Sequence, residues 1–343
     1  MSKQRILPYY YPTTTILVDD SQRFLQSFTL YLPDDTAFRC FTSASEALAH
    51  INQQAGKPHL EQRCFSWFRN SEANHGDTFS LDLSLIEQEI NDSMRFSTVS
   101  VLVVDYDMPE MNGLELCRQL DDPHVRKILL TGVADERVAV QAFNDGLIDR
   151  FLMKNDPDIA TKINHAIKDS QRQYFQRVSA MLQNTLALKS PEFLYNPTFA
   201  DYFFALQMQR GFVEYYYVES PSGFVLLDEH GMLARLLVFS EADLQRSLFA
   251  LRRYQPPASV MQALSAGQVI PWLWATPDEH SADEPFDWQD HLFQASRVSD
   301  GRNTWLCALV EDPPADIEFD AANASYGAYL DLIDSQSPCR QRS

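Results

Sequence analysis

The stretch "SVLVVDYDMPEMNGLELCR", residues 100–118, decides the fold of this chain. Its apolar run predicts a buried strand that ends abruptly at Asp105, with a second carboxylate at Asp107. A proline and Gly113 then indicate a turn, and "GLELCRQL" has the spacing of a helix. A buried strand followed at once by a helix is the repeating unit of an α/β sheet.

The rest of the first half repeats this order of strand and helix. Apolar strand patterns are followed by turns and by helical patterns, both before and after the quoted stretch. The alternation predicts an open, doubly wound α/β fold with a five-stranded parallel sheet, since strands of this kind are buried on both faces. The segments are "TTILVDD", "FRCF", "SASEALAHI", "KILLTG", "DERVAVQAFNDG" and "DRFLMK".

Polar side chains stand where these predicted strands end. They are Asp19, Asp20, Asp105, Thr131 and Lys154. Sheets of this kind bind ligands at the carboxyl ends of their strands, so we expect the five side chains to meet in one crevice. A carboxylate cluster favours a hard cation such as Mg²⁺, and a lysine and a hydroxyl beside it are typical of phosphoryl transfer to a carboxylate.

These residues carry a resemblance to a known family. Residues 14–168 resemble the CheY-like, flavodoxin-like receiver domain of two-component response regulators, at "ILVDD", "VDYDMPEMNGLEL", "LLTG" and "FLMK". The resemblance implies that Asp105 is the phosphoacceptor and that a histidine kinase or a phosphotransfer protein supplies the phosphoryl group. The protein would then catalyse only its own phosphorylation and dephosphorylation.

The resemblance also assigns the metal ligands. Asp20 and Asp105 would bind Mg²⁺ directly and Asp19 through a water molecule. The backbone carbonyl of Asp107 would complete the set.

Three further roles follow from the same resemblance. Thr131 and Lys154 would contact phosphoryl oxygens, and Phe151 occupies the position of the switch aromatic. Phosphorylation would then change the conformation of the receiver and promote formation of a homodimer. "TGVADERVAVQAFNDGLIDRF" is also similar to the response regulators of quorum-sensing circuits that have α-hydroxyketone sensor kinases.

The sequence predicts three parts: a receiver domain over residues 12–156, a long linker helix over 157–190 and an α+β output domain with an antiparallel sheet over 191–343. The linker has apolar residues at spacings of four and seven, which suits either a coiled-coil dimer or a helix packed on its own domain.

An insertion over about residues 54–98 precedes the strand that ends in Asp105. Its segment "LSLIEQEINDSM" predicts a helix. Its aromatic residues suit either a docking or dimer surface, or a lid over the domain's own core. They are Phe65, Trp67, Phe68 and Phe79.

Charge limits the partners of the second half. Residues 190–343 contain nine arginines, no lysine and 22 acidic residues, a net charge of −13 within a total of −19. A duplex-binding surface needs lysine and arginine, so nucleic acid is an improbable partner. No output enzyme motif is present, and we expect an unknown downstream protein as partner. The alternatives are an unrecognised nucleotide-binding or enzymatic module and, less favoured, a DNA-binding regulator.

The sequence has no apolar run that approaches the roughly 20 residues of a membrane span, and its start lacks the apolar stretch of a secretory signal. We therefore expect a cytoplasmic protein without a membrane partner. Five scattered cysteines without paired spacing argue against both a disulfide framework and a zinc site.

Overall fold

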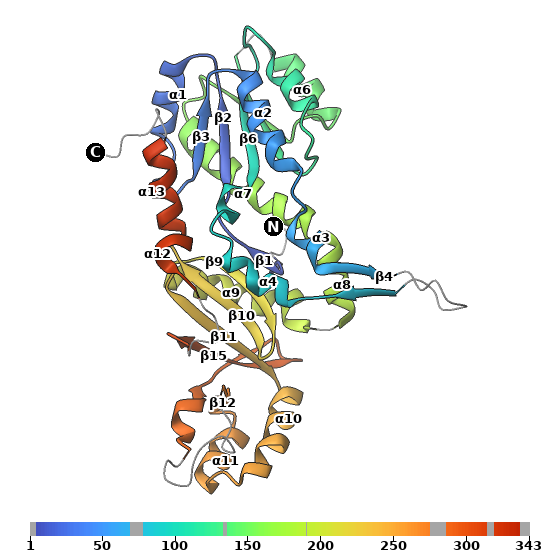
Figure 1. Ribbon diagram of the computed structural model, residues 1–343, viewed down its shortest axis with the longest axis vertical. Helices are drawn as coiled ribbons and strands as arrows, with labels where there is room; N and C mark the ends of the chain where they lie inside the picture. Colours follow the sequence, from blue (N-terminus) through green and yellow to red (C-terminus); the bar gives the residue numbers. More distant parts are fainter. Residues whose placement is uncertain are drawn as a thin grey trace. The chain divides into compact units, whose positions relative to one another are not determined.

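The computed structural model shows two compact units, each built from segments that are separate in the sequence (Figure 1). The parallel-sheet unit comprises Tyr10–Leu81, Glu89–Leu182 and Ala322–Ser343. The antiparallel-sheet unit comprises Met1–Tyr9, Asp82–Gln88 and Gln183–Ala321. The structure describes residues 5–68, 78–132, 136–189, 191–274, 286–313 and 319–336.

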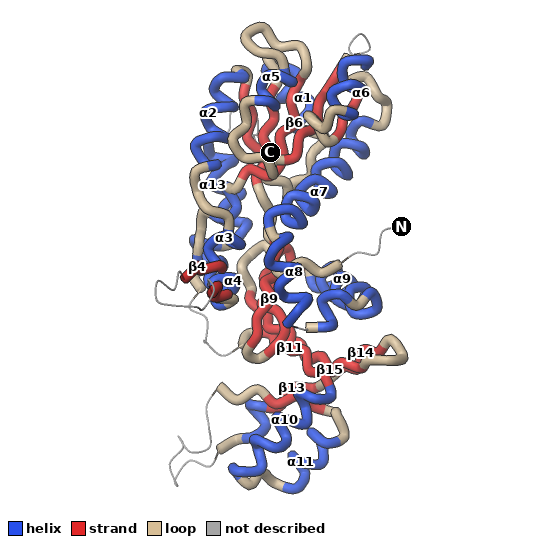
Figure 2. Tube along the Cα trace, turned by 90° about the vertical axis from the view of Figure 1, so that its right-hand side faces the viewer, coloured by secondary structure: helices blue, strands red, loops and turns tan. Residues whose placement is uncertain are grey.

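The parallel-sheet unit confirms the predicted fold class. Its sheet has five parallel strands in the order β3-β2-β6-β7-β8, and helices alternate with these strands along the chain. Figure 2 shows helices flanking the strands of this unit. The central strand β6 is buried along its whole length. The strands are β2 (Thr14–Val18), β3 (Phe38–Phe41), β6 (Val99–Asp105), β7 (Arg126–Thr131) and β8 (Arg150–Met153).

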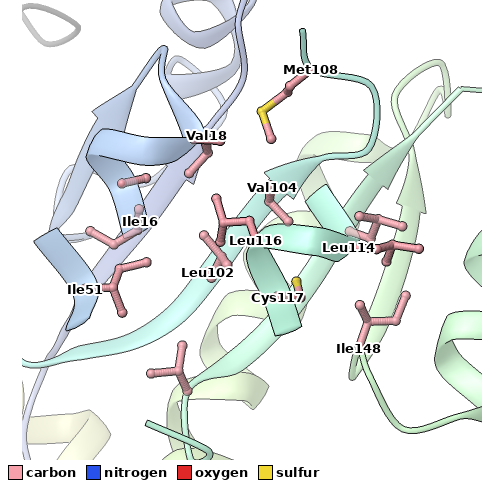
Figure 3. Packing of buried hydrophobic residues seen from close by; sticks show 14 of the residues in the cluster. Ile16, Val18, Ile51, Leu102, Val104, Met108, Leu114, Leu116, Cys117 and Ile148 are labelled. Atoms are coloured by element: carbon pink, nitrogen blue, oxygen red, sulfur yellow. The ribbon is translucent and has the colours of Figure 1, made fainter. Parts of the chain in front are cut away.

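Alternate residues of the strands feed two separate cores, because successive side chains of a strand point to opposite faces of the sheet. One core joins Leu102 and Val104 of β6 to the helices α2, α5 and α6 (Figure 3). The other joins Val101 and Val103 to α1 and α7. The helices are α1 (Gln22–Thr29), α2 (Ala44–Ala55), α5 (Gly113–Arg118), α6 (Glu136–Asn144) and α7 (Ile159–Val178).

Side-chain caps fix where α1, α2 and α5 begin, and Ser21 is the cap of α1. The Ser43 hydroxyl accepts a hydrogen bond from the backbone N–H of Glu46, as the sequence predicts for the start of α2. At the start of α5, the Asn112 side chain accepts hydrogen bonds from two backbone N–H groups, and Glu115 accepts one from the N–H of Asn112. Such caps satisfy donors that the first turn of a helix leaves unpaired.

The expected linker helix over 157–190 is divided. Helix α7 ends at Val178, and α8 (Ala180–Lys189) begins after Ser179. The Ser179 hydroxyl donates a hydrogen bond to the carbonyl oxygen of Phe175 at 2.6 Å, and its backbone leaves the helical conformation. A side chain that bonds to the preceding turn offers the backbone an alternative to the regular helix, which accounts for the break.

Helix α7 packs on its own unit. Ile163, Ile167 and Tyr174 are buried, and the Gln171 amide donates a hydrogen bond to the carbonyl oxygen of Thr13 at 3.1 Å. Ile163, Ile167 and Tyr174 belong to the apolar repeat that suited either a coiled coil or internal packing. For α7, the second alternative is the one that the structure shows.

The C-terminal helix also differs from the expected domain boundary. Helix α13 (Tyr326–Gln336) lies in the parallel-sheet unit, although residues 191–343 were expected to form the output domain. The Tyr326 hydroxyl donates to the carbonyl oxygen of Asp35 at 2.6 Å and accepts from the N–H of Ala37 at 3.0 Å. The Tyr329 hydroxyl lies 2.7 Å from the hydroxyl oxygen of Thr14. These contacts are long-range, so no local pattern indicates them.

The insertion contributes to both units. Helix α3 (Leu60–Cys64) is followed by an antiparallel hairpin of β4 (Phe65–Phe68) and β5 (Thr78–Leu81) in the parallel-sheet unit. The side chains of Trp67, Phe68 and Phe79 lie outside the description, so the role of the insertion's aromatic residues stays a prediction.

The helix predicted over residues 83–94 is shorter than expected. Helix α4 (Ser84–Gln88) belongs to the antiparallel-sheet unit, and only a 3₁₀ turn follows it. The guanidinium of Arg95 donates to the carbonyl oxygens of Ile90 and Asp92, which a continuing helix would pair with its own N–H groups.

The antiparallel-sheet unit confirms the predicted α+β class of the second half. Its main sheet has the order β1-β9-β10-β11-β15-β14, and a smaller sheet pairs β12 with β13. The strands are β1 (Tyr9–Tyr10), β9 (Phe212–Glu219), β10 (Ser222–Asp228), β11 (Leu233–Ser240), β12 (Val269–Pro271), β13 (Leu292–Gln294), β14 (Ser296–Ser299) and β15 (Thr304–Glu311). Its further helices are α9 (Pro197–Arg210), α10 (Glu241–Leu251), α11 (Ala258–Ser265) and α12 (Ala321–Ala324), the last of which spans the boundary between the units.

A buried arginine ties α4 to this sheet. Arg235 of β11 is 1% exposed, and its guanidinium donates to the Glu87 carboxylate at 2.6 Å and to the carbonyl oxygen of Ser220 at 3.3 Å. A buried charge is tolerated only when it is paired and hydrogen-bonded. The insertion therefore supplies the counter-charge for a cation inside the antiparallel-sheet unit.

Candidate acidic site at the carboxyl edge of the parallel sheet

The fold brings the predicted site residues to one edge of the parallel sheet. Asp19 and Asp20 directly follow β2, and Asp105 is the last residue of β6. Thr131 is the last residue of β7, and Lys154 directly follows β8. Because the four strands are parallel, their carboxyl ends share one edge.

Three carboxylates meet at this edge. One carboxylate oxygen from each of Asp19, Asp20 and Asp105 lies within 4.8 Å of the other two. Asp19 and Asp105 are buried, with exposures of 1% and 6%, whereas Asp20 is exposed. The N–H of Ser21 donates to Asp19 Oδ1 at 2.9 Å, which fixes the orientation of this carboxylate. An oxygen-only donor set that is open on one side fits Mg²⁺, which keeps several of its water ligands.

Lys154 bridges the two buried carboxylates. Its Nζ lies 2.6 Å from Asp19 Oδ2 and 2.9 Å from Asp105 Oδ2, and it stands over the Phe24 ring at 4.4 Å from the ring centroid. Burial alone would lower the pKa of Lys154, but the hydrogen bonds to both carboxylates raise it. The ammonium group therefore stays charged and offsets part of the repulsion between the aspartates.

The carboxylate of Asp105 has an unusual environment. Burial raises the pKa of Asp105, and the hydrogen bond and charge of Lys154 oppose this effect. A nearby negative charge on Asp19 raises the pKa further. Asp105 is thus a carboxylate whose charged form depends on a neighbouring cation.

The remaining predicted residues lie around this centre. Thr131 is fully buried, and its hydroxyl donates to the carbonyl oxygen of Gly132 at 3.0 Å. Phe151 is half-buried against the core between the sheet and α6, and its ring packs edge-on against Phe143 at 6.4 Å. Asp107 is exposed two residues beyond β6, and the role of its carbonyl oxygen stays a prediction.

Gly113 has a role that the sequence reasoning assigned only to a turn. A Cβ atom at this position would lie 2.2 Å from the backbone oxygen of Asp105. Its N–H donates to the carbonyl oxygen of Tyr106 at 3.0 Å, which closes the loop after β6. The loop can hold Asp105 in place only if residue 113 has no side chain. The Asn-Gly pair in the quoted stretch was the available signal.

A doubly wound parallel sheet that gathers aspartates, a lysine and a threonine at its carboxyl edge defines the class of receiver domains. Comparison with known proteins agrees. The family model for the response regulator receiver domain matches residues 84–164.

Two relatives extend the likeness beyond this range. The chain is 36% identical to the response regulator LqsR of Legionella pneumophila, with a TM-score of 0.77 that covers 97% of this chain and 98% of that structure. It is 27% identical over 192 residues to the response regulator protein TodT of Pseudomonas putida, covering 54% of this chain and 71% of TodT. The chain therefore belongs to the response regulator family of two-component systems.

Among the residues that the structure describes, no helix is long and apolar enough to cross a membrane.

We expect Gly113→Ala to lower the free energy of unfolding by about 1–3 kcal/mol, because the added methyl group collides with the backbone of Asp105. Urea denaturation checks this value. Gly56→Ala is the matched control, since a Cβ atom there meets nothing within 4 Å and its φ is −74°. Equal stability of the two variants would show that the loop yields freely.

We expect Asp105→Asn to stabilise the protein at neutral pH in the absence of divalent cations. Folding raises the pKa of Asp105, so the charged carboxylate lowers the free energy of unfolding. This loss is absent below the ordinary pKa of 3.8, grows as the pH rises above it, and is complete above the raised pKa. The gain in the variant should therefore shrink as the pH falls and vanish below 3.8.

Urea denaturation at several pH values measures this difference. Asp121→Asn, at an exposed position, is the control and should change little at any pH. A gain that is independent of pH, or a loss of stability at neutral pH, would contradict the electrostatic explanation.

Proposed function

We propose that Asp105 accepts a phosphoryl group from a histidine kinase or a phosphotransfer protein. The observation that carries this proposal is the bridge from Lys154 Nζ to both Asp19 and Asp105 beside a third carboxylate. In the reaction, an Asp105 oxygen attacks phosphorus, an O–P bond forms as the N–P bond of the phosphohistidine breaks, and the imidazole leaves with the bonding electrons.

The surrounding side chains support this reaction by position and charge. Asp20 and Asp105, with Asp19 through water and the carbonyl of Asp107, would hold Mg²⁺, which would neutralise charge on the phosphoryl oxygens when bound. Lys154 already contacts Asp105, and after phosphorylation it would contact a phosphoryl oxygen. Burial of Asp105 excludes water and strengthens these charge interactions.

The same change in charge can act as a switch. A phosphoryl group adds about −1.5 to −2 charges at neutral pH. Thr131 would turn its hydroxyl from the carbonyl oxygen of Gly132 to a phosphoryl oxygen, and Phe151 would change its packing. Reversal of a 1:99 equilibrium requires about 5.5 kcal/mol of differential stabilisation, which several charge-assisted contacts can supply together.

We propose that the antiparallel-sheet unit is the output domain and binds a downstream protein. Residues 190–343 are strongly acidic, which disfavours nucleic acid as a partner. The unit also exposes large apolar side chains, among them Met208, Met232 and Phe249. On the resemblance drawn from the sequence, the protein acts in the cytoplasm within a quorum-sensing circuit that has an α-hydroxyketone sensor kinase.

The first test is the mass of the protein after incubation with acetyl phosphate. We expect a phosphoryl adduct that requires Mg²⁺ and disappears in Asp105→Asn, while Asp121→Asn forms it normally. The same samples on a sizing column should show a dimer only where the adduct forms. An adduct in Asp105→Asn would refute the assigned acceptor, and an unchanged size on phosphorylation would refute dimerisation alone.

The output proposal predicts no response to nucleotides. Incubation with nucleoside triphosphates and cyclic dinucleotides should give no turnover and no shift in the midpoint of thermal unfolding. Saturable binding or turnover would instead establish a nucleotide-binding or enzymatic output domain.

A further inference from the structure

A second cluster of metal-ligating side chains lies in the parallel-sheet unit. His59 immediately precedes α3, and Asp122 and His124 lie in the turn that leads into β7. One ligand atom from each residue lies within 4.8 Å of the other two. Because β7 begins at Arg126, this turn is at the amino edge of the sheet, opposite to Asp105. The cluster is therefore independent of the acidic site.

The contacts within the cluster aim its polar atoms at one another. His59 Nε2 lies 3.6 Å from Asp122 Oδ2, and these two side chains are 22% and 9% exposed. The other oxygen of Asp122 accepts a hydrogen bond from the N–H of His124 at 2.8 Å, which fixes the carboxylate. The two imidazole rings are nearly perpendicular, at 84°, with centroids 5.3 Å apart.

The second ring nitrogen of His59 also has a partner. Its Nδ1 lies 3.4 Å from the hydroxyl oxygen of Tyr174 on α7, and Tyr174 is 2% exposed. A histidine that binds a metal through one nitrogen usually donates a hydrogen bond from the other, which holds the ring in the binding orientation. The Tyr174 hydroxyl is placed to accept such a bond. This arrangement is an observation separate from the proximity of the three ligands.

An ion pair between His59 and Asp122 would not by itself explain the cluster. Such an ion pair needs only one imidazole, whereas the imidazole of His124 also lies close to the carboxylate of Asp122. Two protonated imidazoles so close together would repel each other. A shared cation gives both rings a neutral role as ligands and keeps the carboxylate paired.

We propose that His59, Asp122 and His124 bind a divalent transition-metal ion of the zinc class, with a fourth position for water. Two imidazole nitrogens and one carboxylate oxygen suit zinc and its neighbours, whereas Mg²⁺ prefers the oxygen-only set at the other edge. The bound ion joins the start of α3 in the insertion to the turn before β7, and Tyr174 connects the site to α7. The metal thereby stabilises the attachment of the insertion to the sheet.

The test is a titration of the full chain with Zn²⁺ in excess Mg²⁺, which occupies the acidic site, with a chromophoric chelator as competitor. We expect one equivalent of Zn²⁺ to bind. His59→Gln and His124→Gln should each weaken affinity by more than about 100-fold, and Tyr174→Phe by about 10-fold. His165→Gln, at an exposed position of α7, is the matched control and should bind like the wild type.

Zn²⁺ binding that is equally weak in the wild type and in the double variant His59→Gln/His124→Gln would overturn the proposal. If a variant folds poorly, nitrogen-15 resonances of the wild-type imidazoles decide. Zn²⁺ should shift the resonances of His59 and His124 and leave those of His165 unchanged. Unchanged resonances of His59 and His124 would also overturn the proposal.

Discussion

The bridge from Lys154 to Asp19 and Asp105 is the constraint on which the parallel-sheet unit depends. Two buried carboxylates repel each other, and a cation must contact both for them to stay close together at the carboxyl edge of the sheet. Lys154 follows β8 at one margin of the sheet, while its partners follow β2 and β6. The strands must therefore lie in this order and end at the same edge, both to pack together and to place Lys154 beside the two carboxylates. A strand shifted in register would move a charge away from its partner.

Much of this unit could be predicted because its signals are local. Each strand shows as an apolar run, and each site residue stands directly after such a run, as Asp105 and Lys154 do. The sheet then brings distant residues together without further information. The second half was predictable as strands and helices for the same reason, but its function was not, since no site residue marks the end of its strands.

The features that sequence reasoning missed depend on contacts between distant segments. The break at Ser179 arises from one hydroxyl bonded to the preceding turn, and serine within a helical pattern is common. The placement of α13 depends on Tyr326 and Tyr329, whose partners lie near the start of the chain. His59 and His124 are separated along the chain by most of the insertion, β6 and α5, so no spacing rule connects them. Their only sequence signal was the short Asp-Pro-His turn before β7.

Because α13 belongs to the parallel-sheet unit, the chain cannot be divided at a single residue into two complete units. A fragment that stops after residue 190 loses the tyrosines that bond to Asp35 and Thr14. It keeps α4, although α4 belongs to the antiparallel-sheet unit, where Glu87 is the partner of Arg235. The complementary fragment keeps Arg235 and lacks that carboxylate. Neither unit is therefore encoded by one continuous stretch of sequence, and recombination that exchanges contiguous domains would leave both products incomplete.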